Sequence, residues 1–148
     1  MTSDTPIALP DVNVLVAAHL VAHAHHQVAA SWIATTPQLA LTPITEAGFV
    51  RVMLNPVVTG RQFRTVDIVG ALRDLRALPL CDFLSDDASF TATELPLAGM
   101  QGHRQVTDYH LLNLAISRGG RLITLDRRFP ESLPPQWRGR VTVLGAEP

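Results

Sequence analysis

Residues 7–15, Ile-Ala-Leu-Pro-Asp-Val-Asn-Val-Leu, carry the strongest indication of the fold. Apolar residues lead up to Asp11, Asn13 follows two positions later, and apolar residues then resume. The pattern predicts a buried strand that runs directly into a helix, with a carboxylate at the junction. In an open α/β sheet, ligands bind just outside the carboxyl ends of the strands. Asp11 is therefore either a helix cap or the first residue of a binding site.

The chain has 148 residues, and we expect a single domain over residues 1–148. Apolar residues make up 47% of the sequence and charged residues 17%, which excludes an intrinsically disordered chain. No apolar run approaches the roughly 18 residues that span a bilayer. A signal peptide has a basic segment followed by an apolar run, and the N-terminus shows no such pattern. The only cysteine, Cys81, cannot form an intrachain disulfide, so we expect a cytoplasmic location.

The charges of the chain nearly balance, with a formal net charge of −1. This argues against a broadly basic nucleic-acid surface but leaves room for a local one. All 12 basic residues are arginines, whose planar guanidinium groups suit bidentate contacts with phosphate.

Short apolar runs alternate with segments of helical periodicity along the whole chain. This alternation favours an α/β fold in which helices flank a parallel sheet. The expected strands after the first cover residues 38–41, 80–84, 121–125 and 141–144. A short helix is expected after Asp11, and further helices over about residues 25–35, 44–54, 65–78, 87–94 and 108–118.

Glu46 lies in one of these expected helices. Thr42 and Pro43 predict the start of that helix, because a hydroxyl N-cap followed by proline is a preferred order. Helical spacing places Glu46 on the same side as the apolar residues Phe49 and Met53. Burying an unpaired carboxylate is costly, so an acid on the apolar side of a helix is a candidate functional residue.

Asp108 and Asp126 repeat this arrangement further along the chain. Thr107 is the expected N-cap of a helix, which places Asp108 in the first turn and on the side of the apolar Leu111. Asp126 directly follows the expected strand over residues 121–125, just as Asp11 follows the first strand.

The four acids Asp11, Glu46, Asp108 and Asp126 can therefore converge on one edge of a parallel sheet. Clustered carboxylates repel one another unless they are protonated or neutralised by a cation. Oxygen ligands alone favour magnesium or manganese over zinc. Two such ions about 4 Å apart can activate a water molecule and stabilise the leaving oxygen in phosphodiester hydrolysis.

Each of these acids also has a separate and simpler explanation. Asp11 can be a helix cap, and Asp108 an acid stabilised by the helix dipole. Glu46 can be a solvated helix residue, and Asp126 a turn former. One acidic site explains all four positions together. Asn13 and Thr107 could orient the ligands, and a helix-turn contact and a cap are equally good explanations for them.

Four of the six histidines cluster near the N-terminus, at His19, His23, His25 and His26. Zinc sites need convergent ligands of fixed geometry, usually with a second group of ligands elsewhere in the chain. The single distant cysteine does not provide that second group. We therefore expect these histidines to have surface and helix-end roles.

Four groups of residues, in this order and spacing, resemble the PIN-domain ribonucleases and, more narrowly, the VapC toxins of bacterial toxin–antitoxin pairs. The groups are Pro10-Asp11-Val12-Asn13-Val14-Leu15, Thr45-Glu46 with Arg51 and Asn55-Pro56, Val106-Thr107-Asp108 with Leu111-Leu112, and Thr124-Leu125-Asp126-Arg127. The resemblance implies a three-layer fold with a five-stranded, mainly parallel sheet, and RNA cleavage that depends on Mg²⁺ or Mn²⁺. It also implies a homodimer and inhibition by a small antitoxin. Asp11, Glu46, Asp108 and Asp126 match the acidic residues of the family.

We therefore expect a metal-dependent endoribonuclease in which Asp11 and Asp108 are the principal metal ligands, with Glu46 and Asp126 completing the site directly or through water. The near-neutral net charge means that RNA binding must be local. The candidate residues for it are Arg104, Arg127, Arg128 and the Arg61/Arg64 loop, although a solvated surface role suits each of them as well.

Two other classes of protein remain possible at this point. A phosphatase-like or nucleotide-binding α/β protein would need a glycine-rich phosphate loop or a second early aspartate, and Asn13 stands where that acid would be. A non-catalytic RNA-binding or interaction module with the same fold would be expected to lose acids, whereas all four are present.

Overall fold

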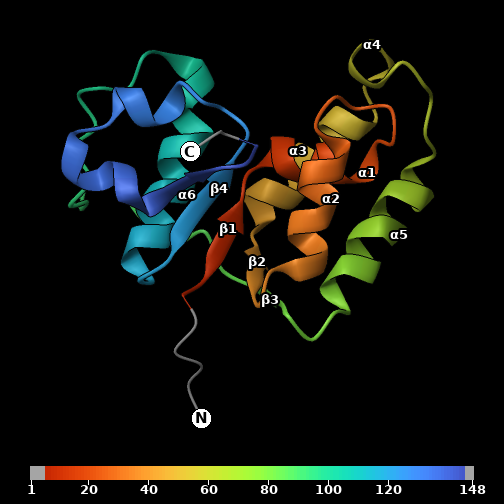
Figure 1. The fold of residues 1–148 in the computed structure, drawn as a ribbon, viewed down its shortest axis with the longest axis horizontal. Coiled ribbons are helices and arrows are strands. Elements are labelled where there is room, and N and C mark those ends of the chain that lie inside the picture. The colour runs from red at the N-terminus through yellow and green to blue at the C-terminus, as the bar shows by residue number, and fades with distance from the viewer. Residues whose placement is uncertain (1–5, 146–148) are drawn as a thin grey trace.

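A computed structural model of the protein describes residues 6–145 (Figure 1). In chain order, its elements are β1 (Ala8–Pro10), α1 (Val12–His19), α2 (His26–Thr35), β2 (Leu39–Leu41), α3 (Pro43–Met53), α4 (Pro56–Thr59), α5 (Thr65–Arg76), β3 (Cys81–Phe83), η1 (His103–Gln105), α6 (Val106–Ser117), β4 (Arg121–Thr124), η2 (Phe129–Ser132), η3 (Pro135–Arg140) and β5 (Val141–Val143). The three η elements are short 3₁₀ helices. Among the described residues, no helix has the length and apolar character needed to cross a membrane.

All strand pairs are parallel, which confirms the expected α/β class. The expected continuous five-stranded sheet is not observed, because the strands form a three-stranded sheet, β1-β4-β5, and a two-stranded sheet, β2-β3. β1 and β2 still lie side by side (Figure 1). Ile7 and Asp11 exchange backbone hydrogen bonds with β4, so the alternate residues Ala8 and Pro10 face β2. Pro10 has no N–H to donate, which removes one ladder hydrogen bond at the junction of the two sheets.

Helices cover both faces of the strands and form a three-layer arrangement. On one face, Ala8 and Ile123 pack against α1 and α2. On the other face, Leu9 and Leu122 pack against α6. β2 packs with α1, α3 and α5 in the largest apolar cluster of the molecule. The carboxyl ends of β1 and β4 therefore lie between α1 and α6, where ligands bind in open α/β sheets.

The ends of two helices follow the sequence closely. At the start of α3, Pro43 occupies the first turn and the Thr42 hydroxyl accepts a hydrogen bond from the Thr45 N–H, as expected. After α6, Gly119 has a φ of 70°. The N–H groups of Gly119 and Gly120 return to carbonyls of the last helical turn, which is the Schellman arrangement.

Two local predictions are wrong. Residues 87–94 are not helical but belong to an irregular connection between β3 and η1. Thr107 is not the N-cap of α6, because η1 runs straight into that helix and Gln105 takes the cap position without a side-chain hydrogen bond. Asp108 nevertheless lies in the first turn of α6, as expected.

Candidate metal centre

Asp11 occupies the junction between β1 and α1 and is almost completely buried, with 3% of its surface exposed. Its Oδ1 accepts a hydrogen bond from the Val14 N–H at 3.0 Å, so Asp11 is the N-cap of α1. Its Oδ2 accepts a second hydrogen bond from the Thr124 hydroxyl. Burial raises the pKa of Asp11 to about 6, although the hydrogen bonds from Thr124, Val14 and the Asn13 backbone oppose this effect.

Thr124 connects Asp11 to Asp126 at the end of β4. The fully buried Thr124 hydroxyl donates to Asp11 and accepts a hydrogen bond from the Asp126 N–H at 3.1 Å. Asp126 Oδ1 accepts a hydrogen bond from the Arg128 N–H at 2.9 Å, which closes the turn after the strand. The turn-forming role that the sequence suggested for Asp126 is therefore confirmed, and the same turn holds Asp126 near Asp11.

Asp108 approaches this group from α6. Its side chain is half-buried, and its carboxylate accepts no hydrogen bond from the residues that the structure describes. Burial and the nearby charges of Asp11 and Asp126 raise the pKa of Asp108 to about 7. Three of the four predicted acids, Asp11, Asp108 and Asp126, thus influence one another electrostatically. The raised pKa values of Asp11 and Asp108 mean that these two carboxyl groups ionise only near neutral pH.

A cavity of about 410 Å³ opens onto Asp11 and Asp108. Its polar lining residues are Asp11, Asn13, Arg51, Arg104, Thr107 and Asp108. One wall of the cavity is the face of α3 that contains Gly48. A Cβ atom at Gly48 would lie 2.6 Å from Val12 Cγ2, so the glycine allows α3 to pack closely against α1.

Three predicted site residues do not line this cavity. Glu46 is only half-buried, and its carboxylate lies 3.9 Å from the Arg76 guanidinium of α5. Arg127 donates a hydrogen bond to the Gly145 carbonyl at 3.0 Å. Asp126 does not line the cavity either, but Thr124 connects it to Asp11.

Two residues of the centre were not predicted as site residues. Thr124 and Arg51 were noted only as parts of the family resemblance. Thr124 is the last residue of a strand and immediately precedes the turn that contains Asp126, which was the available signal. Arg51 follows Gly48 by one helical turn in α3, and this spacing is visible in the sequence once the face of α3 is known.

Two of the clustered histidines, His19 and His26, have the helix-end roles expected of the group. His19 Nδ1 donates to the Leu15 carbonyl, and His26 Nδ1 donates to the Ala17 carbonyl. In residues 6–145, no group of three His, Cys, Asp or Glu side chains is close enough to hold a metal ion.

The chemistry of the donor set at the cavity fits a hard divalent cation. Asp11 and Asp108 offer only oxygen atoms, and Mg²⁺ characteristically binds to one or two carboxylates while it keeps several water molecules. The cavity provides space for that water. A cation would also offset the carboxylate repulsion and the cost of burying a charge, which together raise the pKa values of both acids.

Comparisons with known proteins identify the family of this chain. Residues 8–132 match the sequence pattern of the PIN domain. The chain is 45% identical over 122 residues to Ribonuclease VapC38 of Mycobacterium tuberculosis (strain ATCC 25618 / H37Rv), which covers 81% of this chain and 85% of that protein. It is 37% identical to Ribonuclease VapC29 of the same strain, over 80% of this chain and 84% of that protein. It is 36% identical to Ribonuclease VapC39, over 84% and 92% respectively. The chain therefore belongs to the PIN-domain family.

Proposed function

We propose that this protein is a metal-dependent endoribonuclease, the toxin of a toxin–antitoxin pair, which hydrolyses RNA phosphodiester bonds. The observation that carries the proposal is the pair of carboxylates, Asp11 and Asp108, at a cavity that Arg51 and Arg104 also line. The names of the relatives, all ribonucleases, support the same reaction.

In this proposal Asp11 and Asp108 hold Mg²⁺ or Mn²⁺, and Asp126 and Glu46 contribute through water. When bound, such an ion activates water and stabilises the charge that develops on a phosphate. Thr124 keeps the Asp11 carboxylate in one orientation by donating to its Oδ2. Asn13 and Thr107 line the cavity beside the acids, where they can orient ligands and water.

Arg51 and Arg104 are the best placed residues to bind the phosphate. Both side chains are exposed at the cavity, and neither forms an ion pair with an acid of the described chain. A guanidinium group can donate two parallel hydrogen bonds to phosphate oxygens. Arg127, Arg128 and the Arg61/Arg64 loop would contact RNA further from the cleaved bond.

The partners follow from the toxin role. We propose a cognate VapB-like antitoxin that inhibits the enzyme, a homodimeric assembly, and action in the cytoplasm, where Cys81 stays reduced.

The test is RNA cleavage by the purified protein with Mg²⁺ or Mn²⁺ and with a chelator. We expect cleavage with either metal, none with the chelator, and none for Asp108→Asn. Asp74→Asn is the matched control, because it removes one exposed acid of α5 outside the cavity. Cleavage that continues in the chelator, or in Asp108→Asn at the wild-type rate, would contradict the proposal.

A further inference from the structure

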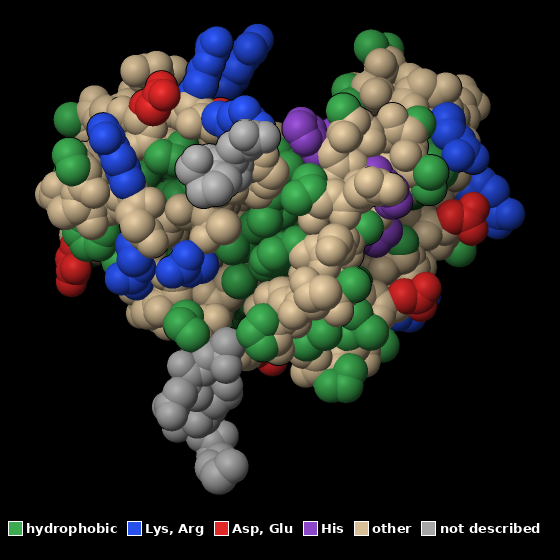
Figure 2. All heavy atoms as spheres, in the orientation of Figure 1, with side chains coloured by type: hydrophobic (Ala, Val, Ile, Leu, Met, Phe, Trp, Pro, Cys, Tyr) green, Lys and Arg blue, Asp and Glu red, His purple; other side chains and the backbone are tan. Residues whose placement is uncertain are grey.

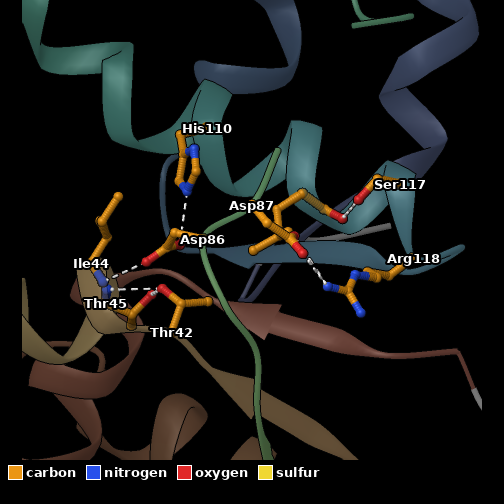
Figure 3. A network of polar contacts seen from close by, with 9 residues as sticks. Thr42, Ile44, Thr45, Asp86, Asp87, His110, Ser117 and Arg118 are labelled. Atoms are coloured by element: carbon orange, nitrogen blue, oxygen red, sulfur yellow. Dashed lines mark hydrogen bonds and ion pairs between the residues drawn. The ribbon is translucent and has the colours of Figure 1, made fainter. Parts of the chain in front are cut away.

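Asp86 lies between Ile44 of α3 and His110 of α6 (Figure 3), and both of these helices line the cavity of the candidate metal centre. Its Oδ2 accepts a hydrogen bond from the Ile44 N–H of α3 at 2.8 Å. Its Oδ1 lies 2.8 Å from His110 Nε2 of α6. The Asp86 and His110 side chains are 13% and 12% exposed, so the contact between them is largely shielded from water.

The contact with α3 completes the start of that helix. The first N–H groups of a helix have no partner within it. The Thr42 hydroxyl accepts from the Thr45 N–H, and Pro43 has no N–H. The Ile44 N–H is therefore the one that needs an outside acceptor, and Asp86 provides a negatively charged one near the positive end of the helix dipole.

The contact with α6 is made two residues beyond Asp108. Because an ionised carboxylate can only accept, His110 Nε2 carries the hydrogen of this bond. The connection that contains Asp86 is fastened to α6 at further points. The Phe90 ring packs edge-on against His110 with centroids 6.3 Å apart, and Asn113 Nδ2 donates to the Ser89 carbonyl.

Asp86 thus joins α3 to α6. Within residues 6–145, no hydrogen bond or ion pair connects these two helices directly. Ile44 of α3 and Asp108 of α6 both line the metal cavity. The Asp108 carboxylate has no hydrogen bond of its own to a described residue, so its position depends on where α6 lies.

We propose that Asp86 is a positioning residue, which fixes the separation of α3 and α6 and thereby places the Asp108 carboxylate for a divalent cation. It touches neither the cation nor the RNA. The inference rests on the proposed function for the identity of the ion's binding residues, but it concerns ion binding, which can be measured without RNA.

The experiment is a titration of the RNA-free protein with Mn²⁺, in which free Mn²⁺ is followed by electron paramagnetic resonance. We expect Asp86→Ala to weaken binding about tenfold, the lower end of the effect of residues that orient metal ligands. Asp86→Asn should bind almost as the wild type, because its amide can accept from the Ile44 N–H and donate to His110 Nε2 once the imidazole hydrogen is on Nδ1.

Asp87→Ala is the matched control. Asp87 is the next residue of the same connection and also contacts the α6 region, but its partner is Arg118, at the opposite end of the helix, at 3.0 Å (Figure 3). Its removal should leave Mn²⁺ binding unchanged. RNA cleavage adds a second readout, since Asp86→Ala should raise the Mn²⁺ concentration for half-maximal rate and largely keep the rate at saturating Mn²⁺. A loss of folded protein would instead lower the rate at every concentration.

Wild-type Mn²⁺ binding by Asp86→Ala would overturn the inference, and so would equal losses in Asp86→Ala and Asp86→Asn. If Asp86→Ala does not fold, Asp86→Glu decides, because it keeps the charge and adds one methylene between the helices. Weakened binding by Asp86→Glu supports the positioning role, and unchanged binding refutes it. A wild-type protein that binds Mn²⁺ but cleaves no RNA would refute the proposed function alone.

Discussion

The four predicted acids divide into two that follow strands and two that lie on helices, and the structure treats them differently. Asp11 and Asp126 follow β1 and β4, and Thr124 connects them by hydrogen bonds. Asp108 and Glu46 lie in the first turns of α6 and α3. The Asp108 carboxylate has no hydrogen-bond partner among the described residues, and Glu46 is paired with Arg76 instead.

This difference has a structural cause. The parallel ladder between β1 and β4 fixes the ends of both strands, so their acids are held by backbone and side-chain hydrogen bonds together. A helix moves as a unit, and an acid on its first turn is only as well placed as the helix itself. In the proposed metal site, the strand acids are therefore the fixed half, and the helix acids are the half that helix packing and a bound cation would complete.

The largest expected effect is the loss of RNA cleavage in Asp11→Asn and in Asp108→Asn. Residues that merely orient a metal ligand typically contribute about 10-fold to 100-fold, so removing a ligand should cost more than about 100-fold. Asparagine at position 11 can still accept from the Val14 N–H, which separates ligand loss from cap loss. The measurement is the single-turnover cleavage rate at saturating Mn²⁺, with circular dichroism as the check on folding.

Asp11→Ala tests the other half of the role of Asp11. It removes the cap as well and should cost about a further 1 kcal/mol of stability relative to Asp11→Asn. If Asp11→Asn cleaved RNA normally while Asp108→Asn did not, the fixed half of the site would be structural only.

The second prediction concerns the pH dependence of stability without metal. The pKa values of Asp11 and Asp108 in the folded protein are about 6 and about 7, against 3.8 for an ordinary aspartate. The folded state therefore binds protons more tightly, and stability falls as the pH rises from about 4 through 7. This contribution is fully present below the unfolded pKa and lost above the folded one, and it amounts to the order of a few kcal/mol.

Thermal unfolding at pH 5 and pH 8 measures this effect. In a chelator, the wild type should lose more stability between these values than Asp108→Asn, and Mn²⁺ at pH 8 should restore it by binding the folded state. A wild type and a variant with the same pH dependence would show that Asp108 ionises freely.

The third prediction concerns Thr124→Val, which keeps the shape of the side chain but removes the hydroxyl that joins Asp11 to Asp126. We expect cleavage to fall by about 10-fold to 100-fold, the range for residues that orient metal ligands. The pKa of Asp11 should rise further, because the Thr124 hydrogen bond favours its ionised form. A carbon-detected NMR titration of the Asp11 carboxyl measures that change, and an unchanged pKa would remove Thr124 from the site.

The sequence was sufficient for the α/β class, the parallel pairing and the positions of Asp11 and Asp108, because strand–helix junctions leave local patterns. It was insufficient where partners are distant along the chain. Asp86 accepts a hydrogen bond from the start of α3, and Asp87 accepts one from Arg118 at the end of α6. Both acids lie in the irregular connection between β3 and η1, where the local sequence pattern predicted a helix.

The same limit applies to the site itself. Helical periodicity placed Glu46 on the apolar side of α3 but could not show its ion pair with Arg76, which is 30 residues further on. η1 merges with α6, and this displaced the expected cap at Thr107. Pro10 is visible in the sequence, but its effect on the sheet depends on whether each residue of β1 faces β2 or β4, and the local sequence does not show this.

The smallest expected effect belongs to Glu46→Gln, and it tests the comparison most directly. The ion pair with Arg76 is partly exposed, at 26% and 42% of the two side chains, so its loss should change stability by no more than about 1 kcal/mol. If Glu46 contributes only through water, cleavage should fall less than about 10-fold, below the effect of an orienting residue. Arg76→Met is the matched control, because it frees Glu46 from its partner without removing the acid. A loss of cleavage in Glu46→Gln as large as that in Asp108→Asn would mean that Glu46 leaves Arg76 and joins Asp108 when the cation binds. Both helix acids would then belong to the half of the site that the cation completes.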